Sequence, residues 1–229
     1  MPTAIVTGAS RGLGRALATA LAERGWRLAI DARDGVALER AAAALRERTA
    51  VVALAGDVAD AAHRRALVAA AAEDRIELVV NNASYLGPSP QPPLAQYPLG
   101  ELERVYRVNV LAPLAVAQLA LPQLAEGARV INVTSDAAVE PYEGWGGYGS
   151  SKAALEQLTA ILAAEHPGLR IYSVDPGDMN TRMQQQAFPG EDISDRPPPE
   201  ASVPGLLALI EGDLPSGRYS ARALAEAAA

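Results

Sequence analysis

Short, continuous apolar runs alternate along this chain with longer stretches in which apolar residues recur every three to four positions. Continuous runs are typical of buried strands, and the periodic stretches are typical of amphipathic helices. The pattern predicts strands at 3–7, 27–31, 50–55, 76–80 and 129–134. It also predicts one helix that ends near residue 24 and four more that span 36–48, 60–73, 100–124 and 146–165. Because the strands are apolar throughout, we expect a doubly wound parallel sheet with helices on both faces. Composition does not break within residues 1–229, which are predicted to form a single α/β domain.

Two proline-rich stretches, 87–98 and 189–204, interrupt this alternation. Proline lacks the amide hydrogen that a helix interior or a central strand requires, so both stretches are predicted to be loops. Each follows a strand, on the side where doubly wound sheets bind ligands. For the stretch 87–98, an ordinary surface loop is an equally good interpretation. We interpret the stretch 189–204 as a substrate lid. The alanine-rich tail from Ala221 is expected to fray.

Composition narrows the classes of function. A formal net charge of −7 argues against a nucleic acid or an anionic membrane as partner. The chain begins directly on an apolar strand without a signal-peptide pattern, and no apolar run is expected to reach membrane-spanning length, so we expect a cytoplasmic protein. There is no cysteine, which excludes disulfides and thiolate sites. The two histidines, His63 and His166, are expected at the surface, so no metal site is predicted.

Glycines at positions 8, 12 and 14 lie between the first strand and the first helix, in the segment GASRGLG. Glycine permits a tight turn and lets the backbone approach a pyrophosphate. The N-terminus of the following helix adds unpaired amide groups and a partial positive charge. The spacing differs from the G-x-G-x-x-G of most dinucleotide folds, so the support for a dinucleotide site comes mainly from the loop's place after the first strand.

Tyr148 and Lys152 lie four residues apart at the start of a predicted helix and therefore share one helix face. Lys152 is the only lysine of the chain, in which all other cationic side chains are arginine. Its ammonium is a compact charge with three donors, unlike the planar guanidinium of arginine. Ser135 follows the apolar run 129–134, thirteen residues before Tyr148. A lone lysine on a solvated helix face would look the same, so this pair needs support from other motifs.

These motifs together resemble the classical short-chain dehydrogenase/reductase family over nearly the whole chain. Residues 7–14 resemble its cofactor loop, and Asp57 resembles its adenine-contacting aspartate. Residues 81–84 resemble its NNAG motif with Ser84 in place of the glycine, a change expected to affect support of the sheet more than the chemistry. Residues 175–181 resemble the segment that lines the nicotinamide.

The resemblance implies a Rossmann-type fold and an NAD(P)-dependent oxidoreductase that reduces a ketone or aldehyde to an alcohol, or catalyses the reverse. It assigns the catalytic tetrad to Asn109, Ser135, Tyr148 and Lys152. The positions expected to bind the cofactor are Gly8, Ser10, Arg11, Gly12, Leu13, Gly14, Arg33, Asp57, Val58, Asn81, Asn82, Ala83, Tyr148, Lys152, Pro176, Gly177 and Thr181.

The end of the second predicted strand bears on the choice of cofactor. An acid there holds the ribose 2′-hydroxyl of NAD, whereas a nearby arginine accommodates the 2′-phosphate of NADP. The chain offers both, Asp31 and Arg33, but the resemblance puts Arg33 at the NADP-type position and Ala32 at the acidic position of the NAD type. Arg11 is a second candidate for the phosphate. We therefore predict NADP(H) in preference to NAD(H), with solvated surface arginines as the alternative.

Tyr148 is predicted to be the general acid, or the general base in the oxidation direction. A phenol pKa near ~10 must fall by about three units, roughly 4 kcal/mol, to serve near neutral pH. A lysine ammonium about 4 Å away at an effective dielectric of 20 supplies roughly that much. We expect Ser135 to donate a hydrogen bond to the substrate oxygen, and the resemblance adds that Lys152 binds the nicotinamide ribose. A Ser–Lys hydrolase is the competing mechanism, but it leaves the glycine loop and Asp57 unexplained.

Pro113 lies inside the predicted helix 100–124 and has no N–H for the carbonyl four residues back, which belongs to Asn109. The Asn109 carbonyl is thus expected to be released at a kink. The resemblance places a water-mediated proton relay to Lys152 there, and a kink made for packing alone is the alternative.

Apolar residues in the loops after the fourth, fifth and sixth predicted strands are the candidates for the substrate pocket: Tyr85, Leu86, Tyr142, Trp145, Met179 and Phe188. They favour an apolar or aromatic carbonyl compound. By family analogy the helices 100–124 and 146–165 would pair two chains in a homodimer or homotetramer. Two other functions stay open, a non-catalytic dinucleotide-binding sensor or scaffold and an NAD-linked alcohol dehydrogenase.

Overall fold

The computed structural model describes residues 1–72 and 75–227. Within these residues, seven strands form one sheet in the order β3-β2-β1-β4-β5-β6-β7, and every neighbouring pair is parallel. This order confirms the predicted doubly wound sheet. The chain first builds the sheet outward from β1 to β3, and it then returns to place β4 on the other side of β1 and builds outward in the opposite direction. The strands are β1 Thr3–Val6, β2 Arg27–Ala32, β3 Val51–Ala55, β4 Ile76–Asn81, β5 Leu124–Val133, β6 Arg170–Asp175 and β7 Gly217–Ser220.

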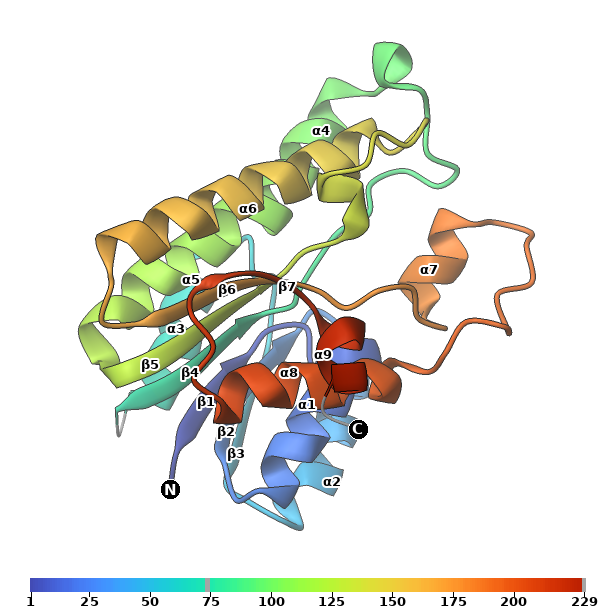
Figure 1. Ribbon diagram of the computed structural model, residues 1–229. Coiled ribbons are helices and arrows are strands. Elements are labelled where there is room, and N and C mark those ends of the chain that lie inside the picture. The colour runs from blue at the N-terminus through green and yellow to red at the C-terminus, as the bar shows by residue number, and fades with distance from the viewer. Residues whose placement is uncertain (73–74, 228–229) are drawn as a thin grey trace.

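Helices cover both faces of the sheet (Figure 1). Alternate residues of β1 enter different cores, because successive strand side chains point to opposite faces. Ala4 and Val6 join the core of α1, α2, α8 and α9, whereas Ile5 joins the core of α3, α5 and α6. On the first face, the helices are α1 Gly12–Glu23, α2 Gly35–Arg46, α8 Val203–Glu211 and α9 Ala221–Ala227. On the second face, they are α3 Ala61–Ala71, α5 Ala112–Ala120 and α6 Gly146–Glu165. Both hydrophobic faces of the sheet are therefore buried.

Two shorter helices, α4 Leu99–Tyr106 and α7 Arg182–Ala187, lie beyond the carboxyl ends of the strands (Figure 1). Single 3₁₀ turns occur at Leu94–Gln96, Leu121–Gln123, Asp136–Ala138 and Pro199–Ser202. The proline-rich stretch 189–204 connects α7 to α8, so it borders the same end of the sheet as the loops that follow β1, β4 and β5. A substrate lid remains our prediction for it.

The predicted helix 100–124 is not uniform. A π-helical turn at Arg107–Leu111 separates α4 from α5, and the Ala112 amide donates to the Arg107 carbonyl, five residues back. Proline at 113, in the first turn of α5, has no amide to continue an α-helical ladder, which explains the irregularity. Strand β5 begins at Leu124, five residues before the predicted start, because an irregular pairing with β4 extends it.

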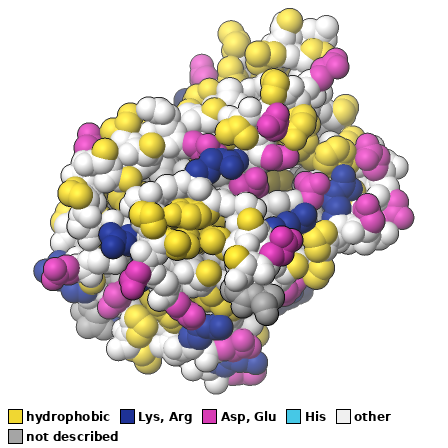
Figure 2. Space-filling model, in the orientation of Figure 1, with side chains coloured by type: hydrophobic (Ala, Val, Ile, Leu, Met, Phe, Trp, Pro, Cys, Tyr) yellow, Lys and Arg dark blue, Asp and Glu magenta, His cyan; other side chains and the backbone are white. Residues whose placement is uncertain are grey.

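The continuous helical stretch Leu99–Gln123 is long and apolar enough to cross a membrane by length and composition, with a mean hydropathy of 1.3. The expectation that no apolar run reaches spanning length is therefore wrong by this criterion. Half of its apolar window is buried inside the protein, and core helices of globular domains pass the same test. Figure 2 shows acidic and basic side chains interspersed over one face of the molecule.

The C-terminal tail does not fray within the described residues. Helix α9 packs on α8, where Gly205 lies against the Ala221 carbonyl and Ala221 is fully buried. Ala221 joins the same core as Leu206 and Leu209 of α8. Helix α8 is separated from the tail by a single strand, β7. Its apolar face provides the packing contact that an isolated alanine-rich segment lacks.

Candidate active site

The glycine loop turns tightly between β1 and α1. Gly8 and Gly12 have φ angles of 69° and 56°, which favour glycine over any residue with a side chain. A Cβ on Gly14 would lie 2.5 Å from the Gly8 carbonyl oxygen and 2.5 Å from Asn82 Nδ2. The Asn82 amide donates to the carbonyls of Thr7 at 2.9 Å and Gly8 at 3.3 Å. The predicted motif at 81–84 therefore holds the loop from the neighbouring strand.

This loop fits the pyrophosphate of a dinucleotide. Helix α1 begins at Gly12 without a side-chain cap, so its first amide groups are available to an anion. Glycine at 12 leaves the backbone uncovered where a phosphate would approach, whereas Gly8 and Gly14 lie close against Ala83 and Asn82. Leu13 is buried and anchors the start of the helix in the core below.

Asp31 lies beneath this loop and not at the protein surface. It is 1% exposed; its Oδ1 accepts a hydrogen bond from the Gly8 amide at 2.8 Å, and its Oδ2 lies 2.9 Å from His63 Nε2. The prediction that His63 is a surface residue is wrong, because its side chain is 9% exposed and packs against Gly56, where a Cβ would clash with the ring. The hydrogen bond to Asp31 raises the pKa of His63 above its ordinary value.

The residues expected to meet the adenosine end of a cofactor lie around the carboxyl ends of β2 and β3. Arg33 is exposed directly after β2. Arg11 is partly committed, since it forms a 2.7 Å ion pair with Asp34, the residue that caps α2. Asp57 caps its own turn by accepting from the Ala59 amide at 2.9 Å, and Val58 is buried.

Tyr148 and Lys152 are both buried in the first two turns of α6. They are 8% and 2% exposed, and the Lys152 ammonium lies 5.4 Å from the centre of the Tyr148 ring. Lys152 Nζ donates to the Val133 carbonyl at 2.7 Å, at the end of β5. Burial lowers the pKa of Lys152 to about 8. The two side chains expected to act together are therefore brought together.

The expected fall in the pKa of Tyr148 is wrong in direction. Burial, together with the smaller effect of the nearby carboxylates of Asp175 and Asp136, raises the pKa of Tyr148 to about 12. The Ser84 hydroxyl acts in the opposite sense and lowers the pKa of Tyr148. The charge of Lys152 favours a lower pKa for the phenol, but the loss of solvent around the buried phenol is the larger effect here.

Ser84 thus affects the phenol, whereas its replacement of glycine was expected to affect support of the sheet more than the chemistry. Its hydroxyl donates to Asn109 Oδ1 at 3.2 Å and also lowers the pKa of Tyr148. A hydroxyl-bearing residue in place of a glycine was the signal in the sequence. Its position depends on the segment after β4, which Asn109 ties to α6.

Asn109 is fully buried and bonded on both ends of its amide. Its Oδ1 accepts from the Tyr85 backbone amide at 2.8 Å, while Nδ2 donates to the Tyr85 carbonyl at 2.9 Å and to Ser151 Oγ at 3.0 Å. Ser151 in turn donates to the Tyr148 carbonyl at 2.6 Å. The side chain thus ties the loop after β4 to α6, and the π-helical turn surrounds it as the kink prediction requires.

The Ser135 hydroxyl is hydrogen-bonded to the two residues that follow it in the chain. Its hydroxyl donates to Asp136 Oδ1 at 2.8 Å and accepts from the Ala137 amide at 3.2 Å. It is half-buried at the carboxyl end of β5, thirteen residues before Tyr148 as the sequence indicates. A role toward a substrate oxygen would require its hydroxyl to turn away from Asp136.

The remaining predicted cofactor residues have structural partners as well. Asn81 donates to Asn132 Oδ1 at 2.8 Å across β4 and β5, and Ala83 donates its amide to Thr7 Oγ1 at 3.0 Å. The Pro176 carbonyl accepts from Ser202 at 2.8 Å, and Thr181 caps α7. Gly177 has a φ of 74° in the turn between them.

Trp145 connects Tyr148 to two further aromatic rings through edge-on or tilted contacts. The Trp145 ring lies 5.8 Å from Tyr148, 5.9 Å from Phe188 and 6.3 Å from Tyr142, measured between centroids. Leu86, Ala137, Met183 and Ala187 complete the apolar cluster around the phenol. Met183, on α7, was missed because nothing in the sequence indicates which side of that short helix faces Tyr148.

Two predicted pocket residues lie elsewhere. Met179 packs against the core of α1 and α8. Tyr85 turns toward α4, where its hydroxyl donates to Glu101 at 2.7 Å and the Arg104 guanidinium lies 4.4 Å from the ring centre. Both were chosen for their position after a strand, which does not determine the direction of the side chain.

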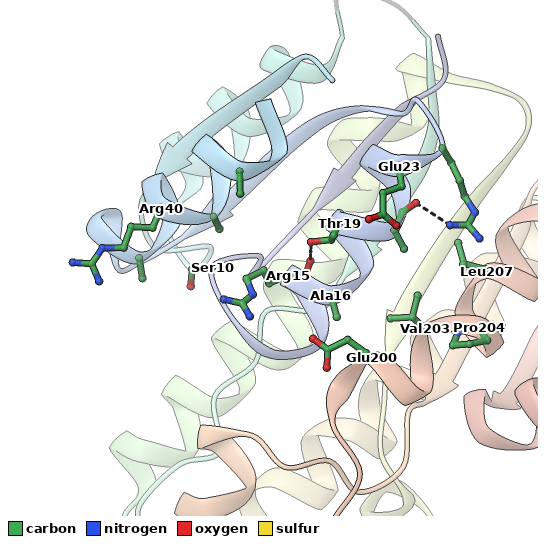
Figure 3. A pocket seen from close by; sticks show the side chains of 15 residues that line it. Ser10, Arg15, Ala16, Thr19, Glu23, Arg40, Glu200, Val203, Pro204 and Leu207 are labelled. Carbon is green, nitrogen blue, oxygen red and sulfur yellow. Dashed lines mark hydrogen bonds between the residues drawn. The ribbon is translucent and has the colours of Figure 1, made fainter. Parts of the chain in front are cut away.

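A separate groove of about 750 Å³ lies between α1, α2 and α8 (Figure 3). It meets the glycine loop at Ser10, and Arg40 on α2 lies across α1 from Pro204 and Leu207 on α8 (Figure 3). None of its lining residues belongs to the Tyr148 cluster. The groove is therefore distinct from the space around the phenol.

Comparison with known proteins agrees with this geometry. Residues 2–192 match the family model described as short chain dehydrogenase. The chain is 34% identical to the rhamnolipids biosynthesis 3-oxoacyl-[acyl-carrier-protein] reductase of Pseudomonas aeruginosa, over 94% of this chain and 82% of that one. It is 35% identical to the sepiapterin reductase of Meriones unguiculatus, over 80% and 76%.

A solved structure from Escherichia coli CFT073 in complex with NADPH superposes with a TM-score of 0.87 at 27% identity, covering 96% of each chain. Family model, reductase relatives and fold agree over most of the sequence. The chain belongs to the short-chain dehydrogenase/reductase family.

Proposed function

We propose that this oxidoreductase uses NADP(H) to reduce the carbonyl group of an apolar or aromatic small molecule, or catalyses the reverse. The observation that carries the proposal is the buried Tyr148–Lys152 pair beside a loop that fits a pyrophosphate. Burying a phenol and an ammonium together costs stability, and such strongly shifted groups cluster at functional sites.

Tyr148 is the proposed general acid. With a pKa of about 12 it is fully protonated near neutral pH and is ready to donate a proton to an oxygen that gains negative charge. The reduced nicotinamide supplies the hydride for the carbonyl carbon when it is bound. Lys152, with a pKa of about 8, remains cationic at neutral pH and stabilises negative charge on the phenol oxygen once the proton has left.

Asp31 supports the preference for NADP(H). Both of its carboxylate oxygens are engaged, one with Gly8 and one with His63, and it is 1% exposed, so it is not available to a ribose hydroxyl. Arg33 is exposed at the same end of the sheet, where its charge suits a phosphate. Arg11 is the second candidate.

The aromatic cluster supports an apolar substrate. The Trp145 ring meets the Tyr148 ring edge-on and contacts Phe188 as well, and Leu86 and Met183 add apolar surface. We also propose that the protein acts in the cytoplasm as a homodimer or homotetramer. Leu111 and Ile161, on the helices that family analogy assigns to the contact, are 55% and 44% exposed.

Consumption of NADPH over a panel of aldehydes, ketones, diketones and quinones tests the proposal, with NADH in parallel. We expect turnover of at least one apolar member and its loss in Tyr148→Phe, which removes the proton and keeps the ring. Binding of NADPH without turnover of any member, and without an effect of Tyr148→Phe, would favour a dinucleotide sensor. A higher kcat/KM with NADH would instead favour the NAD-linked alcohol dehydrogenase.

A further inference from the structure

Arg218 lies on β7, the strand at the edge of the sheet beside β6 (Figure 1), and its guanidinium contacts three segments of the candidate active site. Its Nε donates to Glu156 Oε1 on α6 at 2.9 Å. Its Nη2 donates to the Ser135 carbonyl at 3.4 Å and lies 3.7 Å from Asp175 Oδ2. The side chain thus joins α6 to the carboxyl ends of β5 and β6. It lies beyond residue 192, where the match to the family model ends.

The register of the sheet directs Arg218 toward α6. Arg218 is paired with Ser173 of β6, and Ser173 is paired with Asn132 of β5, so the three side chains share one face of the sheet. Asn132 donates to Thr159 on α6 at 2.8 Å, which identifies this face as the one that α6 covers. Asp175 follows Ser173 by two residues and belongs to the same face. A long side chain at this position of the edge strand therefore reaches both Asp175 and α6.

Two partners of Arg218 belong to segments that are proposed to act in the reaction. Asp175 Oδ1 accepts from the Gly177 amide at 2.9 Å, in the turn predicted to line the nicotinamide. The other oxygen of this carboxylate is the one near Arg218. Ser135 offers only its carbonyl to Arg218, so its backbone is held while its side chain can still rotate toward a substrate. Arg218 therefore bears on the position of the turn and on that of the predicted donor to the substrate.

The third partner, Glu156, connects Arg218 to Lys152. It follows Lys152 by four residues on α6 and shares its helix face, and its carboxylate favours the charged form of the Lys152 side chain. Glu156 Oε1 also accepts from Thr134 Oγ1 at 2.7 Å, so the carboxylate keeps a second donor if Arg218 is removed. The Glu156 side chain is 17% exposed, so water screens the pair only in part. Arg218 thus offsets part of the negative charge that acts on Lys152.

We propose that Arg218 is a further positioning residue of the reaction. It holds the Ser135 carbonyl and the Asp175 carboxylate in place, and it offsets the charge of Glu156. The inference rests on the proposed function, because the segments that Arg218 joins are those of the proposed reduction. Arg218 neither gives nor takes a proton, since a guanidinium stays charged at working pH. Its planar group has donors in fixed directions, which suits acceptors that come from three different elements.

The test compares Arg218→Ala, which removes the guanidinium, with Arg218→Lys, which keeps a charge and serves if Arg218→Ala does not fold. Arg24→Ala is the matched control, because Arg24 likewise donates to a glutamate, Glu211 at 2.7 Å, and to a backbone carbonyl, that of Ala20 at 3.0 Å. Steady-state kinetics give kcat and KM for the reduction. The titration of Lys152 is measured separately on Arg218→Ala and Arg24→Ala with ε-¹³C-lysine, because the only lysine of the chain gives one signal without turnover.

We expect Arg218→Ala to lower kcat by about 10- to 100-fold and to change the KM for NADPH by less than about threefold, because the reacting groups shift while the glycine loop is untouched. The pKa of Lys152, about 8 in the wild type, should rise by about one pH unit, because the charge of Glu156 is no longer offset. Arg218→Lys should regain part of kcat, and Arg24→Ala should match the wild type in both measurements.

A lower melting temperature of Arg218→Ala with an unmoved kcat and an unmoved Lys152 titration would mean that Arg218 is merely structural, and would overturn the inference. A raised KM for NADPH with an unchanged kcat would overturn it as well, because the residue would then serve cofactor binding. Full activity of Tyr148→Phe would instead overturn the proposed function, while the Lys152 titration would still report on Arg218.

Discussion

The imidazole Nε2 of His63 lies 2.9 Å from Oδ2 of Asp31, and the other oxygen of the same carboxylate accepts the Gly8 amide at 2.8 Å. Helix α3 is thereby connected to the glycine loop through one buried carboxylate. Asp31 and His63 are 32 positions apart in the sequence, where nothing indicates that they form a pair. The Asp31 carboxylate, the His63 imidazole and the Gly8 amide thus meet beneath the turn that is proposed to hold the pyrophosphate.

His63→Gln should loosen the loop and weaken NADPH binding, because Asp31 loses its cationic partner. The folded-state pKa of His63 lies above 6.5, so the stabilisation by the pair is complete below pH 6.5 and is lost as the pH rises through the folded-state value. We expect a loss of about 1.5–3 kcal/mol in the free energy of unfolding at pH 6, and a smaller loss at pH 9. Urea unfolding at both pH values measures it, with His166→Gln as control. An equal loss at both pH values would contradict the ionic pairing.

Lys152→Met should abolish turnover and stabilise the protein near neutral pH. Burial lowers the pKa of Lys152 from 10.5 to about 8, so the folded state resists charging. The unfolded state then binds more protons between these values, and wild-type stability rises with pH from about 8 to 10.5. The shift corresponds to roughly 3 kcal/mol, which is reduced by about 1 kcal/mol for the lost hydrogen bond to Val133.

The advantage of Lys152→Met in urea unfolding should therefore be largest at pH 7 and smaller at pH 10. An advantage that does not vary with pH would show that Lys152 is not buried as a charge in the folded state.

Gly14→Ala should disable the cofactor loop. The added methyl group would lie 2.5 Å from both the Gly8 carbonyl and Asn82 Nδ2, so the loop must move away from the strand that holds it. We expect NADPH affinity to fall by about 100-fold or more, as for a loss of roughly 3 kcal/mol. Gly100→Ala is the matched control, because nothing lies within 4 Å of its Cβ. That variant should bind normally and gain about 0.5–1 kcal/mol of stability in α4. Isothermal titration of both variants decides the outcome.

Arg33→Ala should discriminate between the two cofactors. Loss of a charge-assisted contact to the 2′-phosphate is expected to lower kcat/KM for NADPH by about 10- to 100-fold, and to leave NADH nearly unaffected. Arg11→Ala should have the smaller effect, since its guanidinium is already paired with Asp34 at 2.7 Å. Steady-state kinetics with both cofactors provide the comparison. Equal losses for NADPH and NADH would exclude recognition of the 2′-phosphate by Arg33.

The sequence by itself determined the strands and helices up to residue 165 and the parallel sheet with two covered faces, since continuous apolar runs alternate there with periodic stretches. The bounds of β6, β7, α7, α8 and α9 came from the structure. The sequence also determined the glycine loop and the Tyr148–Lys152 pair, because turns and helix faces depend on residues close together in the chain. Proline at 113 indicated the irregularity near Asn109, although not its π-helical form.

Tertiary structure alone decided the partners and the solvation of the side chains. It placed Ser84 where its hydroxyl lowers the pKa of Tyr148, turned Asp31 toward Gly8 and His63, and directed Tyr85 and Met179 away from the phenol. It also reversed the expected shift of the Tyr148 pKa. The physical reason is the same in each case: desolvation and hydrogen bonding depend on which distant segments pack together, and spacing along the chain does not report that packing.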